Sequence, residues 1–110
     1  MARFEKDMTY QIEFISEAAQ DYKSLDGSVK RKVDKKLENL SKNPFLGEHL
    51  GNKFDIDLTG FYKLYVDNKK VRIVYRLLGE EIEIIEVWGI GKRDKEEIYK
   101  LIGHRLKKKQ

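Results

Sequence analysis

The sequence contains no cysteine and has one proline and two histidines among its 110 residues. Without cysteine the chain can form no disulfide, no thiolate zinc site and no cysteine nucleophile. The two imidazoles, His49 and His104, are far apart in the sequence and show no spacing typical of metal ligands. We therefore expect neither a metal centre nor a small-molecule cofactor.

Long apolar runs are also missing. No stretch approaches the roughly 20 consecutive apolar residues that a helix needs to span a bilayer. The opening segment, MARFEKDM, contains no apolar run of the kind found in signal peptides. We therefore expect a cytoplasmic protein without membrane contact, whose residues 1–7 form a flexible leader.

Charged residues make up 38% of the chain and hydrophobic residues 40%, which is enough apolar material for one packed core. We expect a single domain over residues 8–106, followed by a basic tail at 107–110. The net charge of +4 favours a polyanion such as RNA or DNA, and equally an acidic protein partner. Charge alone does not choose between them.

The first half of the chain predicts a strand and two helices. Residues 8–14 alternate between apolar and polar side chains, which indicates a strand with one buried face. Ser16 is expected to cap a helix that ends near Asp26, and Ser28 to cap a second that ends near Pro44. The second helix has an apolar stripe formed by Val29, Val33, Leu37 and Leu40.

The second half predicts three strands and a helix. Residues 45–60, FLGEHLGNKFDIDLTG, are glycine-containing and are expected to form a loop, in which one short strand is possible. The runs FYKLYV, KVRIVYRL and EIEIIEVWGI are separated by turn-forming pairs and predict an antiparallel meander. From Arg93 onward, Ile98, Leu101, Ile102 and Leu106 recur at helical spacing.

The predicted element order is β-α-α-β-β-β-α. It indicates an α+β fold with an antiparallel sheet, which the first strand is free to join. The helical hairpin is expected to pack on one face of this sheet. A C-terminal helix completes the domain.

One face of the meander is predicted to be cationic and aromatic. Because strand side chains alternate, Lys63 and Tyr65 point to one side, and antiparallel pairing brings Arg72 beside Lys63 or Tyr65. Cations of this kind bind phosphates, and exposed rings stack on unpaired bases, so the face suits single-stranded RNA. The alternative is an ordinary solvated sheet face.

The segment GIGKRDKEEIYK contributes further candidates. Arg93 is expected to follow a glycine-containing turn after the last strand, and Tyr99 to lie in the final helix. Helical spacing places Arg93 and Lys100 on one side of this predicted helix, two turns apart. The alternatives are that Tyr99 is a core residue and that Arg93 is an exposed charge at the helix start.

These residues resemble the RelE-like toxins of bacterial and archaeal toxin–antitoxin pairs, from Thr9 to about Arg105. The most specific matches are YKL, VRIVYRL and GKRDKEEIY, and LENLSKNP followed by a glycine is similar. The resemblance implies a RelE-like fold and ribosome-dependent, metal-independent cleavage of messenger RNA. It transfers catalytic roles to Lys63, Arg72, Arg93 and Tyr99.

One position departs from the pattern, because Tyr65 stands where the best-studied branch has a second lysine. Lys63, with its charge disfavoured by neighbouring arginines, or else Tyr65, is expected to activate the ribose 2′-hydroxyl. Arg72 and Arg93 would hold the phosphate, and Tyr99 would stack on or orient a base. Further RNA contacts are expected from Phe61, Arg76, Lys92 and Lys100.

The resemblance also implies partners, namely a cognate antitoxin protein, the ribosome and messenger RNA. The antitoxin would cover the basic face or displace the last helix. Two alternatives remain open on the same scaffold. One is a ParE-like inhibitor of DNA gyrase, and the other is a nontoxic homologue that retains antitoxin binding.

Overall fold

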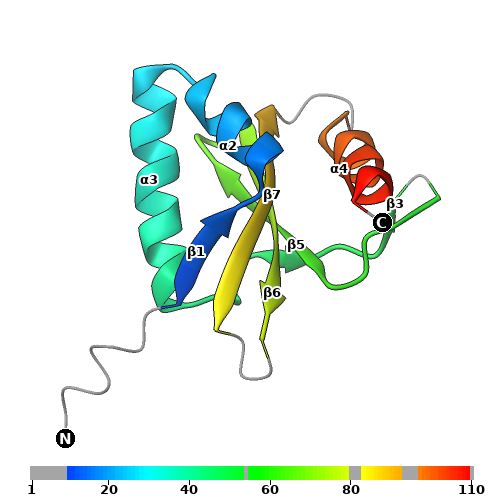
Figure 1. The fold of residues 1–110 in the computed structure, drawn as a ribbon. Helices are drawn as coiled ribbons and strands as arrows, with labels where there is room; N and C mark the ends of the chain where they lie inside the picture. Colours follow the sequence, from blue (N-terminus) through cyan, green and yellow to red (C-terminus); the bar gives the residue numbers. More distant parts are fainter. Residues whose placement is uncertain (1–9, 54, 80–82, 93–96, 110) are drawn as a thin grey trace, which may run out of the picture.

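A computed structural model describes residues 10–53, 55–79, 83–92 and 97–109. The elements, labelled as in Figure 1, are β1 (Gln11–Phe14), α2 (Ser16–Lys23), α3 (Gly27–Lys42), β2 (Glu48–His49), β3 (Asn52–Lys53), β4 (Ile56–Asp57), β5 (Phe61–Val66), β6 (Val71–Leu78), β7 (Ile84–Lys92) and α4 (Glu97–Lys108). The first two residues of the predicted basic tail, 107 and 108, therefore belong to α4. The predicted leader lies outside the described residues.

Five strands form the main sheet in the order β1-β7-β6-β5-β2. The predicted meander β5-β6-β7 is confirmed as antiparallel, and β2 joins its outer edge antiparallel to β5. β1 pairs in parallel with β7, so the sheet is mixed at this one edge. β3 and β4 form a small hairpin of their own. The loop predicted at 45–60 thus contains three short strands.

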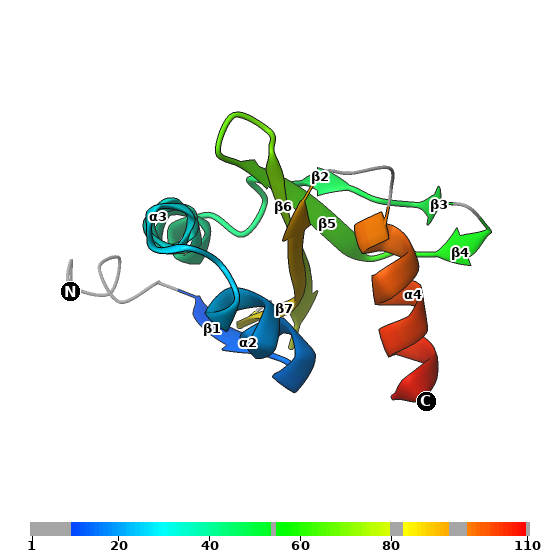
Figure 2. The ribbon, with the colours of Figure 1, turned by 90° about the horizontal axis from the view of Figure 1, so that it is seen from above.

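Helices cover both faces of the sheet. Figure 2 shows α2 and α3 on one side and α4 on the other. On the first side, Leu40 and Val33 of α3 pack in a core with Ile73 and Val87. On the second, Ile98 and Ile102 of α4 pack with strand residues such as Val74, Phe61 and Trp88. The predicted α+β fold, with a helical pair on one face, is confirmed.

Both predicted helix caps differ from those observed. Residue Ile15 occupies the N-cap of α2 without a side-chain cap bond, and Ser16 lies in the first turn. At α3 the cap is Asp26, whose carboxylate accepts a hydrogen bond of 3.0 Å from the Val29 amide. The Ser28 hydroxyl donates to the same carboxylate at 2.7 Å. Both residue types can cap, and the carboxylate two residues earlier takes this role because the helix begins at Gly27.

The prediction of a glycine-containing turn before Arg93 is wrong for Gly89 and Gly91, because β7 continues through both glycines to Lys92. A Cβ atom at Gly89 would lie 2.6 Å from the Ile102 Cδ1 atom of α4. These glycines therefore allow close packing of α4 on the sheet and do not form a turn.

Leu101, which was predicted on the apolar stripe of α4, is exposed. No helix in the described part of the chain is long and apolar enough to cross a membrane.

Candidate functional site

Four of the predicted catalytic residues meet on the α4 side of the sheet. In the β5–β6 register Tyr65 lies directly opposite Arg72, which is one of the two pairings that strand alternation allowed. The Arg72 guanidinium lies 5.5 Å from the centre of the Tyr65 ring and 4.9 Å from that of the Tyr99 ring. Tyr99 comes from the first turn of α4, so tertiary packing brings it to the sheet. We call Lys63, Tyr65, Arg72 and Tyr99 the cationic cluster.

Arg72 is the most unusual member of the cationic cluster because it is a buried charge, with 8% of its surface exposed. Its Nε and Nη1 atoms are buried and have no hydrogen-bond partner among the described residues, and the same holds for the Tyr99 hydroxyl. Buried polar groups are nearly always hydrogen-bonded, since leaving one unpaired costs free energy. Donors held in this way are suited to an anionic acceptor such as a phosphate.

Lys63 lies beside Tyr65 at the more open end of the cationic cluster. Its ammonium donates a hydrogen bond of 3.1 Å to the Tyr65 hydroxyl and lies 3.7 Å from the Glu48 carboxylate. Burial lowers the pKa of Lys63, but the Tyr65 bond and the electrostatic effect of Tyr99, Tyr65 and Glu48 outweigh it, so the pKa is raised. The expected lowering of the Lys63 pKa is therefore wrong for the described residues, among which Arg93 is not included, and Lys63 stays protonated at neutral pH.

Glu48 is a site residue that the sequence did not reveal. It belongs to β2, where it pairs with Lys63 across the edge of the sheet, and its side chain is largely exposed. A strand of two residues has no alternation to detect, so the sequence pattern predicts only a loop at Glu48. The register between β2 and β5 is what places a carboxylate beside the lysine.

Phe61 and Arg76 form a separate cluster further along the same face. Arg76 lies between the Phe61 and Trp88 rings, at 5.6 and 4.8 Å from their centres, and pairs with Glu86 at 2.7 Å. The Trp88 indole donates to the same carboxylate. Phe61 is buried, so its ring offers no exposed surface to an RNA base. Cross-strand packing accounts for both residues.

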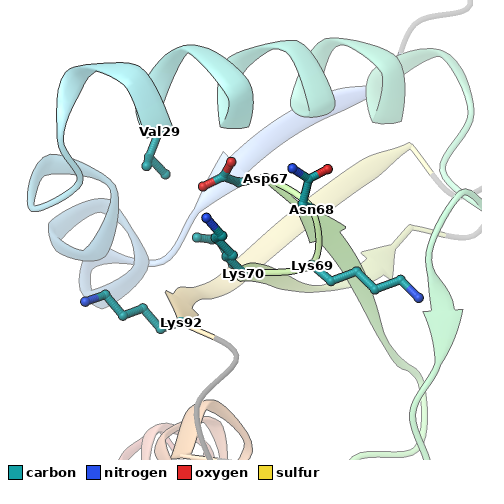
Figure 3. A pocket seen from close by; sticks show the side chains of 7 residues that line it. Val29, Asp67, Asn68, Lys69, Lys70 and Lys92 are labelled. Atoms are coloured by element: carbon teal, nitrogen blue, oxygen red, sulfur yellow. The ribbon is translucent and has the colours of Figure 1, made fainter.

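The remaining predicted residues lie apart from the cationic cluster. Lys92 is exposed at the end of β7, beside the β5–β6 turn (Figure 3). Lys100 is exposed on α4 and lines a hollow beside the β3–β4 hairpin. Arg93 lies outside the described residues. Tyr99 is 4% exposed, and its ring covers Arg72 in this structure. The described residues contain no group of three or more His, Asp or Glu side chains able to hold a metal ion.

Comparison with known proteins identifies relatives over almost the whole chain. A RelE-like toxin protein of Escherichia coli is 28% identical over 100 residues, covering 91% of this chain and all of the relative. The mRNA interferase toxin RelE of E. coli K12 is 26% identical over 92 residues, covering 84% of this chain and 92% of RelE. Both are similar to this chain at low identity.

Solved structures support the same relationship at the level of the fold. A RelE variant from E. coli in the free state superposes with a TM-score of 0.70 at 23% identity, covering 89% of this chain and 98% of that one. The toxin in the intact E. coli RelBE toxin–antitoxin complex superposes with a TM-score of 0.61 at 23% identity, covering 78% and 99%.

The family model for the ParE toxin of type II toxin–antitoxin systems, parDE, matches residues 2–105. This span contains every described element up to the buried Arg105 of α4. The resemblance noted in the sequence is therefore confirmed at the family level. The chain belongs to the RelE/ParE superfamily of toxins from type II toxin–antitoxin systems.

Proposed function

We propose that this toxin is an mRNA endoribonuclease that cuts messages on the ribosome and so inhibits translation. The observation that carries the proposal is the buried Arg72 guanidinium, whose Nε and Nη1 atoms have no partner among the described residues and which shares the Tyr65 ring with the protonated Lys63. Fixed cations of this kind stabilise the negative charge that grows on a phosphate during cleavage. The mRNA interferase activity of the RelE relative supports the same assignment.

The reaction requires no metal. The ribose 2′-oxygen forms a bond to phosphorus while the bond from phosphorus to the 5′-oxygen breaks, which leaves a 2′,3′-cyclic phosphate and a 5′-hydroxyl. Arg72 neutralises the phosphate, and Tyr99 holds the guanidinium through its ring. Lys63, kept protonated by its surroundings, gives its proton to the departing 5′-oxygen. Arg93 is the second proposed cation.

Two oxygen atoms beside Lys63 can accept the proton of the 2′-hydroxyl. One belongs to Tyr65, which is hydrogen-bonded to Lys63 and accepts the proton as a phenolate, and the other to the exposed carboxylate of Glu48. Tyr65→Phe and Glu48→Gln separate them, because each removes one acceptor and keeps the shape of the side chain. The variant that lacks the true base should show the larger fall in single-turnover rate. Its pH–rate profile should also lose the acidic limb.

The ribosome supplies the positioning that this small site lacks. The cationic cluster holds few groups, and much of the rate of an intermolecular reaction comes from orienting the reactants. We expect purified toxin to cut a message on a programmed ribosome much faster than the same naked RNA. Equal rates on the two substrates would contradict the ribosome dependence. Such an enzyme acts in the cytoplasm, where ribosomes are.

An antitoxin is the proposed protein partner, as in the RelBE complex. The exposed apolar side chains of the described residues, Phe45, Leu46 and Leu101, provide surface that such a partner can bury. Leu101 lies on α4, the helix that also carries Tyr99. An antitoxin that contacts α4 would therefore influence the cationic cluster directly.

The decisive experiment induces the toxin in bacteria and maps cuts in cellular messages, with Arg72→Lys and Arg72→Ala as variants. We expect growth arrest with cuts inside codons for the wild type, partial activity for Arg72→Lys, and none for Arg72→Ala. Arg31→Ala, an exposed change on α3, is the matched control and should keep full toxicity. Thermal unfolding of each purified variant verifies that the fold survives. Full toxicity of both Arg72 variants would overturn the assignment.

Inhibition of DNA gyrase is the second candidate, and the match to the ParE toxin family favours it. A gyrase inhibitor binds a protein and needs no phosphate-cleaving cluster. Plasmid supercoiling measured after induction separates the two functions. Loss of supercoiling with intact messages would replace the first proposal by the second.

A further inference from the structure

The turn between β5 and β6 projects beside α3 and has a hollow on each side. Its residues Asp67, Asn68 and Lys69 all have positive φ angles, of 56, 53 and 69°. The turn is fixed to α3 because the Lys32 ammonium lies 2.6 Å from the Asp67 carboxylate. One hollow has a volume of about 490 Å³ and opens toward Lys92 of β7. The other, of about 360 Å³, faces α3.

Lysines dominate the walls of both hollows. Figure 3 shows Lys70 and Lys92 around the larger hollow, while Lys69 extends away from α3. Among the described residues that line the two hollows, the only carboxylate is that of Asp67, which Lys32 already pairs. We call the lysines of these walls the turn surface, which consists of Lys32, Lys35, Lys36, Lys69, Lys70 and Lys92.

The turn surface is continuous with the cationic cluster. The Lys69 ammonium lies 5.6 Å from the centre of the Tyr65 ring. The same ring contacts Lys63 and Arg72 on the sheet. An RNA backbone that reaches Arg72 can therefore continue past Tyr65 and along the turn, with cationic side chains beside it over this whole path.

We propose that the turn surface binds the phosphate backbone of RNA next to the segment held at the cationic cluster. The inference rests on the proposed RNA-cleaving function and extends it to a second contact region. Lysines are point charges without a fixed recognition geometry, and the described residues that line the two hollows include no aromatic ring. The contact is therefore electrostatic and independent of base sequence.

An acidic protein segment fits this surface less well. A protein that folds onto a partner needs to bury apolar area, whereas the apolar lining of the two hollows consists of Val29, Val66 and Val71. The large apolar side chains that the described residues expose lie outside the two hollows. A polyanion with little apolar surface of its own is the better match.

The test measures binding without cleavage, using a fluorescent 20-nucleotide single-stranded RNA that carries 2′-O-methyl groups. Lys69, Lys70 and Lys92 are changed together to Gln. If each contacts one phosphate, the slope of log K against log salt should fall by about 2, since each contact to a single strand contributes about 0.7. The same slope change lowers the affinity at 0.1 M salt by about 100-fold.

The matched control removes the same charge elsewhere, by changing the exposed Lys23, Lys42 and Lys108 to Gln. Its slope should change by less than about 0.5, because net charge alone contributes little at this ionic strength. Equal slopes for the two triple variants would overturn the proposal. So would unchanged RNA binding with weaker binding of a 20-residue polyglutamate, which would identify an acidic protein site instead.

The outcome is separable from that of the proposed function. A toxin that binds RNA through the turn surface but cuts no message on the ribosome would refute the cleavage proposal and keep the binding site. If the variant without the three lysines cuts messages normally and its RNA binding has an unchanged salt slope, the turn-surface proposal is refuted and the cleavage proposal is kept.

Discussion

Arg105 of α4 and Asp21 of α2 form a two-pronged ion pair, with Nη1–Oδ2 and Nη2–Oδ1 distances of 2.7 and 3.0 Å. Arg105 Nη1 also donates to the Trp88 carbonyl at 2.8 Å, and Asp21 accepts from the Ile90 amide at 3.1 Å. The pair therefore binds backbone groups of β7 beyond the residues that pair with β1, and it fixes α4 to the sheet. Tyr99 lies on the same helix, so this link also fixes its place above Arg72.

Replacing Asp21 by Asn should destabilise the fold strongly. Arg105 is 7% exposed, and removal of its partner leaves a buried charge uncompensated. We expect a loss of about 3–5 kcal/mol in the free energy of unfolding, measured by urea denaturation. Glu38→Gln, which removes an exposed partner of Lys42 at 3.9 Å, is the control and should cost less than about 0.5 kcal/mol. Similar losses for both would show that the Asp21 pair does not fix α4.

Gly89→Ala should loosen the packing of α4 on β7. The added Cβ would lie 2.6 Å from the Ile102 Cδ1 atom and 3.2 Å from an Arg105 nitrogen. Overpacking of this kind costs about 1–3 kcal/mol, and displacement of α4 should also lower message cleavage. Gly51→Ala is the matched control, because an added Cβ there meets nothing within 4 Å. If Gly89→Ala changed neither the free energy of unfolding nor message cleavage, α4 would accommodate the methyl group without moving.

Acid should weaken the contact between Glu17 and Lys109, whose charged atoms are 3.2 Å apart. A backbone hydrogen bond and then Lys109 lower the pKa of Glu17 from 4.5 to about 2. A carboxylate with a lowered pKa stabilises the fold above its unfolded value, and this contribution is lost as the pH falls toward 2. Urea midpoints of the wild type and Glu17→Gln should therefore differ at pH 6 and converge near pH 2. A constant difference would refute the shift.

Tyr99→Phe and Tyr99→Leu distinguish the ring of Tyr99 from its hydroxyl. The hydroxyl is buried without a partner among the described residues, so Tyr99→Phe should keep or raise the unfolding free energy. It should also keep cleavage within about threefold, because the ring that contacts Arg72 remains. Tyr99→Leu should lower cleavage by at least about tenfold, measured at a temperature where urea denaturation shows the variant to be folded. Equal cleavage by the two variants would exclude a role for the ring.

Local patterns predicted most of the fold. The alternation in FYKLYV and VRIVYRL depends on strand geometry alone, so it correctly placed Lys63, Tyr65 and Arg72 on one face, with Arg72 beside Lys63 or Tyr65. The apolar stripe through Val33, Leu37 and Leu40 likewise follows from helical geometry and predicted the buried side of α3. These features need no information about distant parts of the chain.

The structure decided what depends on contacts between distant segments. The parallel pairing of β1 with β7, the place of Glu48 beside Lys63, and the closeness of Tyr99 to Arg72 each join residues that no local pattern connects. The raised pKa of Lys63 follows from neighbours that include Tyr65, Tyr99 and Glu48, and its direction is opposite to the one expected from the sequence. The sequence alone thus determined the longer strands, the helices and the type of side chain on each of their faces. Tertiary packing alone set the charge state and burial of those side chains, because electrostatic and desolvation effects depend on distance in space.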